Sequence, residues 1–456
     1  MKGSTAASRI ALFGNFGTGN LGNDATLRAM VENLRRIVPA ADIVCVCPAR
    51  GRTVLGEIEA IPMRAPIRFW KQRRDGSPQP RETGLTEESA PAQHWLASAV
   101  SSIRDWLRVC LWPFTETYRW FRGIRALAGR DLLIMTGTGM LGDYAITPLG
   151  LHYDIFRWTL IARLCRCKVL FVGVGSGPIR HPLSRYFVRV VLALADYRSY
   201  RDDTSRLCLD AIGGRVANDL VCPDLAFSLP VTHASVTERV TSPQMVIGVG
   251  LLNYHDRRGR SVMDDSAYRN YIAHLASFVG RLCDGKFRVR LLIGDVVWDQ
   301  RVIRDLRDQL AQRAIKYREN LISDSSACSI SDLLEHISSV DIVVSSRYHN
   351  VVLALLLGKP AIAISYHEKF KPLMESVAMG GYCQDIEQID VETLIGKILT
   401  IRDNRRLLCG RIVEEVDRMR LALEEQYVHI AQLTQQHGVS NNERLVPTLI
   451  SCMLRG

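Results

Sequence analysis

The sequence predicts an α/β protein made of two doubly wound, Rossmann-like domains that face one another across a cleft. Short apolar runs alternate with amphipathic stretches along most of the chain, and strands separated by such helices pair in parallel with right-handed crossovers. The alternation occurs in two series, and a stretch from Pro230 to Pro243 without hydrophobic periodicity lies between them. A chain of 456 residues has room for about two or three domains.

The positions of the apolar residues define the individual elements. From Leu27 to Ile37 they recur three and four apart, which is the spacing of an amphipathic helix, and Pro48 ends the strand that follows. The first series is expected at Arg9–Gly14, Asp24–Val38, Asp42–Cys47, Asp131–Met135, Tyr153–Arg166, Lys168–Val174 and Ser184–Ala195. The second series is expected at Met245–Gly250, Asp264–Cys283, Phe287–Ile293, Asp299–Lys316, Val340–Ser345, His349–Leu357 and Pro360–Ile364.

These patterns divide the chain into an N-terminal domain over 1–235, a C-terminal domain over 236–400 and a helical segment over 401–456. The N-terminal domain carries a long insertion over 50–130. Within it, residues 64–94 are rich in Pro, Gly, Ser and charge, which predicts a loop or a disordered segment. The charged helix expected over Arg405–Gln436 is hypothesised to pack on the N-terminal domain.

The composition is typical of a soluble globular protein, with 47% hydrophobic and 23% charged residues. It excludes a collagen-like chain or a small disulfide scaffold. The net charge is +11, and 49 of the 58 basic residues are Arg, whose planar fork suits phosphate and carboxylate. Two explanations for this excess of arginine remain open, a preference for anionic substrates and simple solubility. No apolar run has the length of a membrane-spanning helix, and no signal peptide, nucleic-acid site or metal cluster is expected, which favours a cytoplasmic protein.

Residues 101–130 form an unusual basic stretch. It contains Trp106, Trp112 and Trp120 with six Arg and only two acidic residues. One interpretation is a helix that covers a flank of the first domain. The other is an amphipathic segment that lies on the inner face of the cell membrane.

A glycine-rich loop follows the first expected strand. Gly17, Gly19 and Gly22 match the spacing of the dinucleotide fingerprint, but the acidic residue expected after the second strand is absent, and Arg50 follows that strand instead. Dinucleotide binding is therefore weakly supported. Contact with some other ligand and a purely structural turn remain as alternatives.

Further polar residues follow other expected strands, at the edge where ligands of open α/β sheets bind. Asp143 ends the segment from Thr136 and is suited either to a sugar hydroxyl or to capping the next helix. Arg201 precedes Asp202, so that this pair is either an anion clamp or a structural ion pair. Asp224 follows in Cys222-Pro223-Asp224.

The most informative segment is Ser345 to Asn350. It places the guanidinium of Arg347 and the imidazole of His349 between a strand and the start of a helix, where free N–H groups favour an anion. Imidazole titrates near neutral pH and is suited to proton transfer. The next strand leads to Lys369, which is expected on the same edge of the sheet.

These segments together resemble the polysaccharide pyruvyl transferase family. The resemblance is carried by Gly14 to Ala25, Gly137 to Asp143, Val172 to Pro178, Tyr200 to Ser205, Pro223 to Phe227 and Arg347 to Lys369. It implies a fold of the glycosyltransferase-B type. It also implies transfer of the enolpyruvyl unit of phosphoenolpyruvate onto sugar hydroxyls as a ketal, in the synthesis of a surface or exported polysaccharide.

The implied reaction assigns hypothetical roles to the candidate residues. Phosphoenolpyruvate carries a phosphate and a carboxylate, so Arg347, Lys369 and Arg201 are the expected donor-binding residues. His349 is the expected general acid that protonates the methylene carbon, with Arg347 as its catalytic partner. The acceptor, a polysaccharide or a lipid-linked sugar, is expected to contact Asn20, Asp24, Asp143 and Asp224. No cofactor and no metal are required, because phosphoenolpyruvate is itself the donor substrate.

Two other functions remain open. A nucleotide-sugar-dependent glycosyltransferase would use the same pair of domains and the same anion site. A non-catalytic adaptor would dock on a membrane assembly through residues 101–130.

Overall fold

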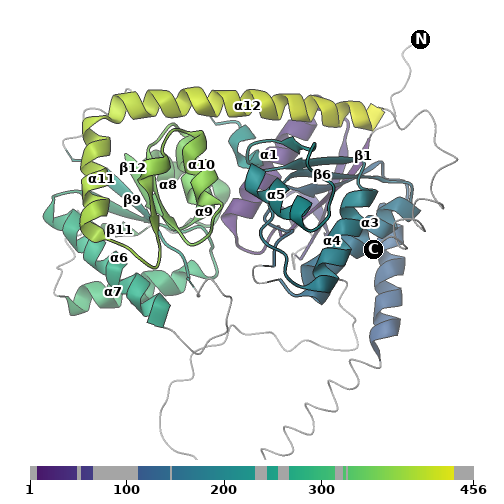
Figure 1. The fold of residues 1–456 in the computed structure, drawn as a ribbon, viewed down its shortest axis with the longest axis horizontal. Coiled ribbons are helices and arrows are strands. Elements are labelled where there is room, and N and C mark those ends of the chain that lie inside the picture. The colour runs from purple at the N-terminus through teal and green to yellow at the C-terminus, as the bar shows by residue number, and fades with distance from the viewer. Residues whose placement is uncertain are drawn as a thin grey trace, which may run out of the picture.

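The protein contains two parallel β-sheets, each covered by helices on both faces, as the sequence predicts (Figure 1). The structure is a computed structural model that describes residues 8–48, 53–64, 111–143, 146–231, 244–254, 266–313, 322–324 and 327–435. The fold class is therefore confirmed, whereas residues 65–110 of the expected insertion and most of the stretch from Pro230 to Pro243 lie outside the described residues.

The first sheet has eight strands in the order β3-β4-β2-β1-β5-β6-β7-β8. All neighbours pair in parallel except β3 and β4. The strands are β1 (Arg9–Phe13), β2 (Asp42–Cys47), β3 (Thr53–Val54), β4 (Ile58–Pro62), β5 (Leu132–Thr136), β6 (Lys168–Val174), β7 (Tyr197–Tyr200) and β8 (Leu220–Val221). Its helices are α1 (Leu21–Ile37), a helix over 111–127, α3 (Tyr153–Leu164), α4 (Pro182–Leu194) and α5 (Asp203–Ala211), with short turns η1 (Pro148–His152) and η2 (Leu225–Ser228).

The second sheet has six strands in the order β11-β10-β9-β12-β13-β14, all in parallel. The strands are β9 (Val246–Gly250), β10 (Arg288–Leu292), β11 (Ile322–Asp324), β12 (Ile342–Ser345), β13 (Ala361–Ser365) and β14 (Cys383–Asp385). Its helices are α6 (Ser266–Asp284), α7 (Asp299–Gln312), α8 (Ile330–Ser338), α9 (Tyr348–Leu356), α10 (Phe370–Ser376) and α11 (Val391–Asp403), with a short turn η3 (Gly380–Tyr382).

The central strands of both sheets are apolar because both of their faces are covered. The residues of β5 and β12 are all buried, as expected for strands between two layers of helices. The helix α1 begins three residues before the expected start, since the Asn20 side chain accepts hydrogen bonds from the N–H groups of Gly22 and Asn23 and caps the first turn. The glycine-rich loop therefore ends inside the helix.

The edge strands β3 and β4 lie within the segment expected to be an insertion. They extend the first sheet beyond β2. Strand β4 pairs with β2 in parallel, in a register that runs from the pair Val44 and Glu59 to the pair Cys47 and Pro62. Their apolar residues are too few to show a period, which is why the sequence pattern did not reveal them.

A long C-terminal helix, α12 (Arg405–Gln435), runs along both domains (Figure 1). Arg405 binds Asp341 of the second domain at 2.7 Å, and farther along the helix Tyr427 lies 3.0 Å from Ser228 of the first domain. The helix thus packs on the N-terminal domain and joins it to the C-terminal one.

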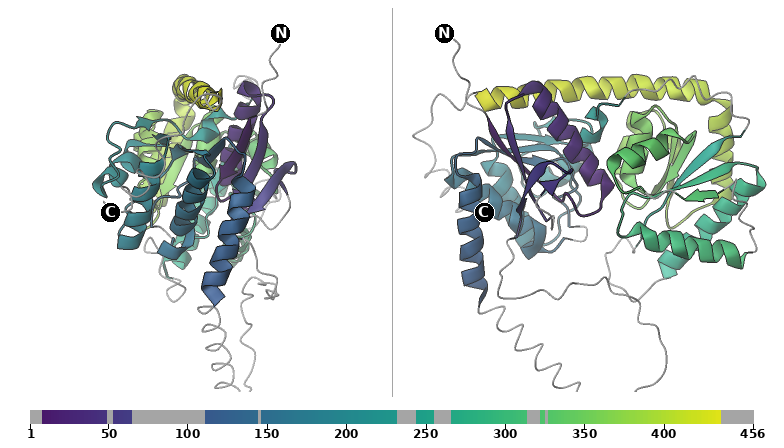
Figure 2. Two further views of the ribbon diagram at one scale, coloured as in Figure 1. Left: turned by 90° about the vertical axis from the view of Figure 1, so that its right-hand side faces the viewer. Right: turned by 180° about the vertical axis from the view of Figure 1, so that it is seen from behind.

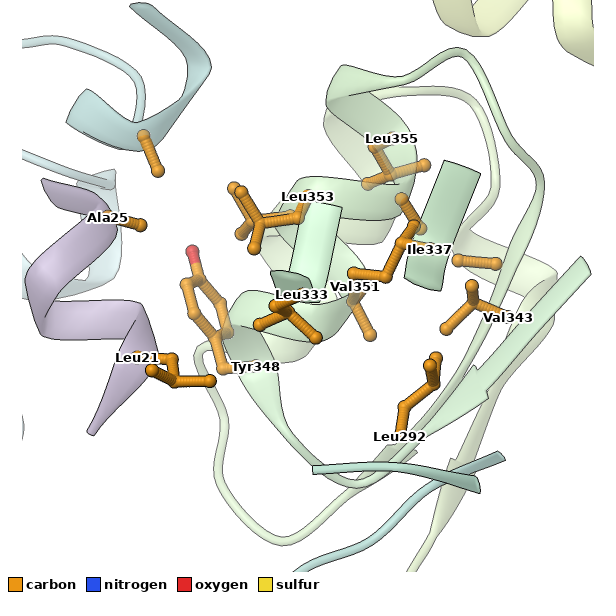
Figure 3. Packing of buried hydrophobic residues seen from close by; sticks show 14 of the residues in the cluster. Leu21, Ala25, Leu292, Leu333, Ile337, Val343, Tyr348, Val351, Leu353 and Leu355 are labelled. Carbon is orange, nitrogen blue, oxygen red and sulfur yellow. The ribbon is translucent and has the colours of Figure 1, made fainter. Parts of the chain in front are cut away.

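A single apolar cluster also crosses the boundary between the domains. Leu21 and Ala25 on α1 point toward Tyr348 and Leu333 of the second domain (Figure 3). Since burial of apolar surface is favourable, this contact and α12 hold the two carboxyl edges of the sheets together.

Candidate functional site

A cavity of about 230 Å³ lies between the two domains, where the carboxyl ends of the strands of both sheets meet. Its lining is polar and comes from both sides. The N-terminal domain contributes Asn15, Asn20, Gly22, Asn23, Thr138, Gly139, Gly142, Asp143, Ser176, Gly177, Pro178 and Arg201. The C-terminal domain contributes Gly294, Arg347, Tyr348, His349, Asn350, Tyr366, His367 and Lys369. Arg347, His349, Lys369 and Arg201 are therefore brought together, as the sequence pattern suggested.

Arg347 is fixed by an acidic partner that the sequence analysis did not identify. The residue precedes α9, and its Nε donates to Oδ2 of Asp299 at 3.0 Å while its Nη2 binds Oδ1 of the same carboxylate. Asp299 is fully buried and also accepts the N–H groups of Gly294 and Asp295 at 2.9 Å. This bidentate pair orients the guanidinium and leaves Nη1 as the nitrogen available to a ligand.

The ring of Tyr348 lies between two cations. The guanidinium of Arg201 is 4.7 Å from the ring centroid and Nζ of Lys369 is 5.1 Å from it, both within cation–π range. Lys369 Nζ also donates to the Tyr366 hydroxyl at 2.9 Å. Burial alone would raise the pKa of the Tyr366 phenol, but the nearby cations, Lys369 first among them, hold that pKa below its usual value. The two tyrosine rings therefore lie among several cationic side chains of the cavity.

His349 faces the cavity at the junction of the two domains. Its Nε2 lies 3.9 Å from Oδ2 of Asp224 and has no hydrogen-bond partner among the described residues. Burial lowers the pKa of the imidazole to about 4; Asp224 opposes this shift, and Arg201 is the first of the cations that reinforce it. With this pKa the imidazole is neutral at pH 7.

Gly22 on α1 provides the space that His349 occupies. A Cβ atom at this position would lie only 2.0 Å from Nδ1 of the imidazole. The glycine that matched the dinucleotide fingerprint therefore lets the first turn of α1 approach His349 closely.

We expect Gly22→Ala to displace the imidazole and to lower kcat by about 100-fold, since a shift of about 1 Å has that effect on a positioned group. The substitution favours the helix, so the thermal unfolding temperature should not fall by as much as a cavity mutation would cause. Gly410→Ala in α12, whose added Cβ meets nothing within 4 Å, is the control. A Gly22→Ala protein with wild-type kcat in steady-state assays would contradict this placement of His349.

Arg201 and Asp224 form a buried ion pair behind the imidazole. The Nη1 of Arg201 lies 3.4 Å from Oδ2 of Asp224, and its Nε lies 3.5 Å from Oδ2 of Asp202. Both contacts are longer than the usual 2.7–2.9 Å of charge-assisted hydrogen bonds, about 0.5 Å too long for a strong pair. Asp202 also caps α5 by accepting the Ser205 N–H, so its role here is structural. Arg201 retains capacity for an anion.

The four residues expected to contact an acceptor lie in different environments. Asp143 lines the cavity, and its Oδ2 accepts the N–H groups of Arg180 and His181. Asn20 also lines the cavity, but its Oδ1 caps α1. Asp24 is not part of the lining: its carboxylate accepts the Gly17 N–H at 2.9 Å, and burial raises its pKa.

Asp224 likewise does not line the cavity and lies behind His349. Its Oδ1 caps η2 by accepting the Ala226 N–H at 3.0 Å. Its carboxylate lies beside the imidazole, at a distance too long for a direct hydrogen bond.

Main-chain hydrogen bonds join the domains at the edge of the cavity. The Leu21 N–H donates to Gly294 O and the Val296 N–H donates to Gly19 O, both at 2.9 Å. Gly19 has a φ of +97°, which a residue with a side chain rarely adopts. The glycine-rich loop thus contacts the other domain of the chain itself.

Several residues of the site were not identified from the sequence. These are Asp299, Tyr348, Asn350, Tyr366 and His367. Tyr348 lies between Arg347 and His349, and Tyr366 directly follows β13. Their places beside candidate residues could have identified them as site residues, whereas Asp299 is remote in sequence from all of these.

Among the described residues, no three His, Cys, Asp or Glu side chains gather as a metal site requires. In the same part of the chain no helix is long and apolar enough to cross a bilayer.

Solved structures with the same two-domain arrangement are enzymes of sugar nucleotides and sugar transfer. A UDP-GlcNAc 2-epimerase from Neisseria meningitidis, bound to UDP-GlcNAc, matches with a TM-score of 0.52 and 12% identity over 93% of this chain and 99% of the epimerase. A glycosyltransferase from Rickettsia africae matches with a TM-score of 0.51 and 12% identity over 95% of this chain and 100% of the other. At such identities the similarity shows the fold alone, which is of the glycosyltransferase-B type.

The comparison of sequences is more specific. No match was found among curated protein sequences. The model of the polysaccharide pyruvyl transferase family, however, matches residues 20–368, from the cap of α1 to the loop after β13. The matched region includes Arg201, Arg347 and His349. The chain therefore belongs to the polysaccharide pyruvyl transferase family.

Proposed function

We propose that the protein transfers the pyruvyl unit of phosphoenolpyruvate to two hydroxyls of one sugar, as a ketal. The observation that carries the proposal is that three cationic side chains and one imidazole surround a single cavity of about 230 Å³ between the domains. That volume is below the roughly 300–1,000 Å³ of sites for drug-sized ligands, so it suits a small donor.

The charge of the cavity supports a donor with two anionic groups. Arg347, Arg201 and Lys369 reach it from three different elements. Guanidinium forks bind phosphate or carboxylate in a bidentate manner, and the lysine adds a point charge. We assign these three residues to the phosphate and the carboxylate of phosphoenolpyruvate.

The reaction requires protons to move in a balanced way. One sugar hydroxyl adds to C2 of the donor while an imidazolium gives a proton to the methylene carbon, which becomes a methyl group. The proton of that hydroxyl then returns to the imidazole. The second hydroxyl then replaces phosphate at C2, and the proton of that hydroxyl leaves with phosphate. We assign the proton delivered to the methylene carbon to His349, with Asp224 as the carboxylate that orients the imidazole.

The acceptor side of the proposal involves the N-terminal domain. Asp143 and Asn20 line the cavity from the N-terminal domain and are assigned to a sugar of a polysaccharide or of a lipid-linked precursor. The proposal places the enzyme in the cytoplasm, in contact with the membrane through residues 101–130, of which the structure describes 111–130. Nucleic acid is not among its proposed partners.

Phosphate release from phosphoenolpyruvate in the presence of candidate glycans tests the proposal. Transfer should release one phosphate for each ketal formed. Phosphoenolpyruvate should also raise the thermal unfolding temperature of the free protein, because a ligand that binds only the folded state stabilises it. Stabilisation by UDP-sugars with none by phosphoenolpyruvate would favour a nucleotide-sugar glycosyltransferase instead.

Lys369→Ala is expected to raise the KM for phosphoenolpyruvate by roughly 10- to 100-fold, the effect of losing one hydrogen bond to a charged group. The change should appear mainly in KM, because the residue binds the donor without transferring a proton. Lys371→Ala is the matched control, since Lys371 lies two residues farther along, in the first turn of α10, and its side chain is 77% exposed. Equal donor KM values for the two variants in phosphate-release assays would remove Lys369 from the donor site.

A further inference from the structure

The helix over 111–127 uses only one of its faces to pack on the N-terminal domain. Glu116 on that face accepts hydrogen bonds from Arg157 at 2.8 Å and from the Tyr153 hydroxyl at 2.9 Å. Gly123 and Leu127, two and three turns further, are buried as well, and a Cβ atom on Gly123 would meet Ile161 of α3. The helix is thus firmly attached to α3.

The opposite face carries large apolar side chains that remain exposed. Phe114 is 74% exposed and Phe121 is 59% exposed. Phe114, Tyr118 and Phe121 recur at spacings of four and three and so form one stripe. The first turns of this helix, drawn in blue, project past the ends of α3 and α4 (Figures 1 and 2).

A second cavity, of about 630 Å³, lies between this helix and β4. Its lining comprises Glu59, Ala60, Ile61, Pro62, Met63, Tyr118, Arg119, Phe121, Arg122, Gly123, Arg125, Ala126, Arg130 and Trp158. Four arginines face a single acidic residue. The exposed aromatic stripe also borders the cavity, because Tyr118 and Phe121 belong to both.

The arginines of this cavity are incompletely neutralised by the described residues. Arg130 lies 3.4 Å from Asp42 and Arg119 lies 3.2 Å from Glu116, while that glutamate also binds Arg157. Arg122 donates to the Tyr118 hydroxyl at 3.4 Å, and no ion pair of Arg122 is found within the described part of the chain. An anion with several acceptor oxygens would satisfy these guanidinium groups together, as a phosphate does.

We propose that the cavity between β4 and the helix over 111–127 binds the phosphate of an anionic phospholipid, while the aromatic stripe enters the bilayer interface. Aromatic side chains at the headgroup level and arginines beside them are the two features of helices that lie in a membrane surface. A protein partner or a second copy of this chain would have to cover the same charges with acidic residues. An anionic lipid surface buries the aromatic side chains of the stripe and also brings a phosphate to the arginines of the cavity.

This surface goes beyond the transfer reaction, because it brings the enzyme to lipid-linked acceptors without entering the interdomain cavity. Co-sedimentation of the full chain with vesicles tests it. One set of vesicles contains phosphatidylcholine alone and the other contains phosphatidylcholine with phosphatidylglycerol. We expect binding to the second set, weakened by salt because the charges lie at the surface.

Two variants separate the two parts of the surface. Arg122→Gln with Arg125→Gln should weaken binding to the anionic vesicles by roughly 25-fold, about fivefold for each arginine. Phe114→Ala with Phe121→Ala should weaken it by roughly 100-fold or more. The matched controls are Arg411→Gln on α12 and Trp298→Ala, whose indole is 55% exposed on the second domain, and both should bind as wild type.

Three outcomes would overturn the proposal. The first is equal binding to both sets of vesicles or to neither. The second is binding that the paired arginine substitutions leave intact. The third is a monomer–dimer equilibrium, measured by analytical ultracentrifugation, that the paired Phe substitutions abolish while vesicle binding persists. Such a result would assign the aromatic stripe to contact with a second copy of the chain.

A competition experiment distinguishes a lipid phosphate from free phosphate. Inorganic phosphate at low concentration should not release the protein from the vesicles, and release would indicate a site for free phosphate. Because binding alone is measured, a negative result leaves the proposed transfer reaction untouched.

Discussion

His349→Ala is expected to lower kcat for pyruvyl transfer by about 100- to 10,000-fold, the usual contribution of a general acid. The KM for phosphoenolpyruvate should change much less, since the cations that bind the donor remain. His349 is a titratable residue of the cavity lining, and its Nε2 has no hydrogen-bond partner among the described residues. Single-turnover and steady-state phosphate release measure the effect. A variant with wild-type kcat would remove His349 from the proton transfer.

The protonation state of His349 gives this prediction a second measurement. Burial lowers the pKa of the imidazole to about 4, so little of it carries a proton at pH 7. The phosphate and carboxylate of a bound donor add negative charge and should raise that pKa, which means that binding takes up a proton. Calorimetry of donor binding in buffers of different ionisation enthalpy detects the uptake. The uptake should be absent in His349→Gln, and its persistence there would assign the proton to another group.

The edge of the sheets that carries the site was predictable, because its residues follow apolar strands. Arg347 comes after β12, Lys369 after β13 and Arg201 after β7, and parallel strands bring their carboxyl ends to one edge. The two series of strands similarly fixed the number of sheets. The lowered pKa of His349 was not predictable, because it depends on burial by a helix of the other domain.

The roles of the acidic residues required the structure. Asp24, Asp143 and Asp224 occur in the same kinds of segments and all accept backbone N–H groups, but of the three only Asp143 lines the cavity. A carboxylate at a strand end serves equally well as a helix cap or as a ligand, and sequence alone does not separate these uses. Asp299 shows the converse, because nothing in its neighbourhood in the sequence indicates its pairing with Arg347, 48 residues away.

Asp299→Ala is expected to lower the free energy of unfolding by about 3–5 kcal/mol, because it leaves the buried charge of Arg347 without a partner. It also removes the acceptor for the N–H groups of Gly294 and Asp295, which form the strand end that contacts the glycine-rich loop of the other domain. Urea denaturation followed by fluorescence and by circular dichroism measures the loss. Asp308→Ala, an exposed position of the same helix, is the control and should change the midpoint little.

A double substitution separates the charge from the backbone contacts. If the unpaired guanidinium accounts for most of the loss, Arg347→Ala combined with Asp299→Ala should be more stable than Asp299→Ala alone, since no buried charge then remains unpaired. If the two losses simply add, the pair contributes no coupling and Asp299 acts through the backbone of Gly294 and Asp295. Catalysis distinguishes these cases further, because a guanidinium that has lost its orienting carboxylate should raise the KM for phosphoenolpyruvate even in a variant that remains folded.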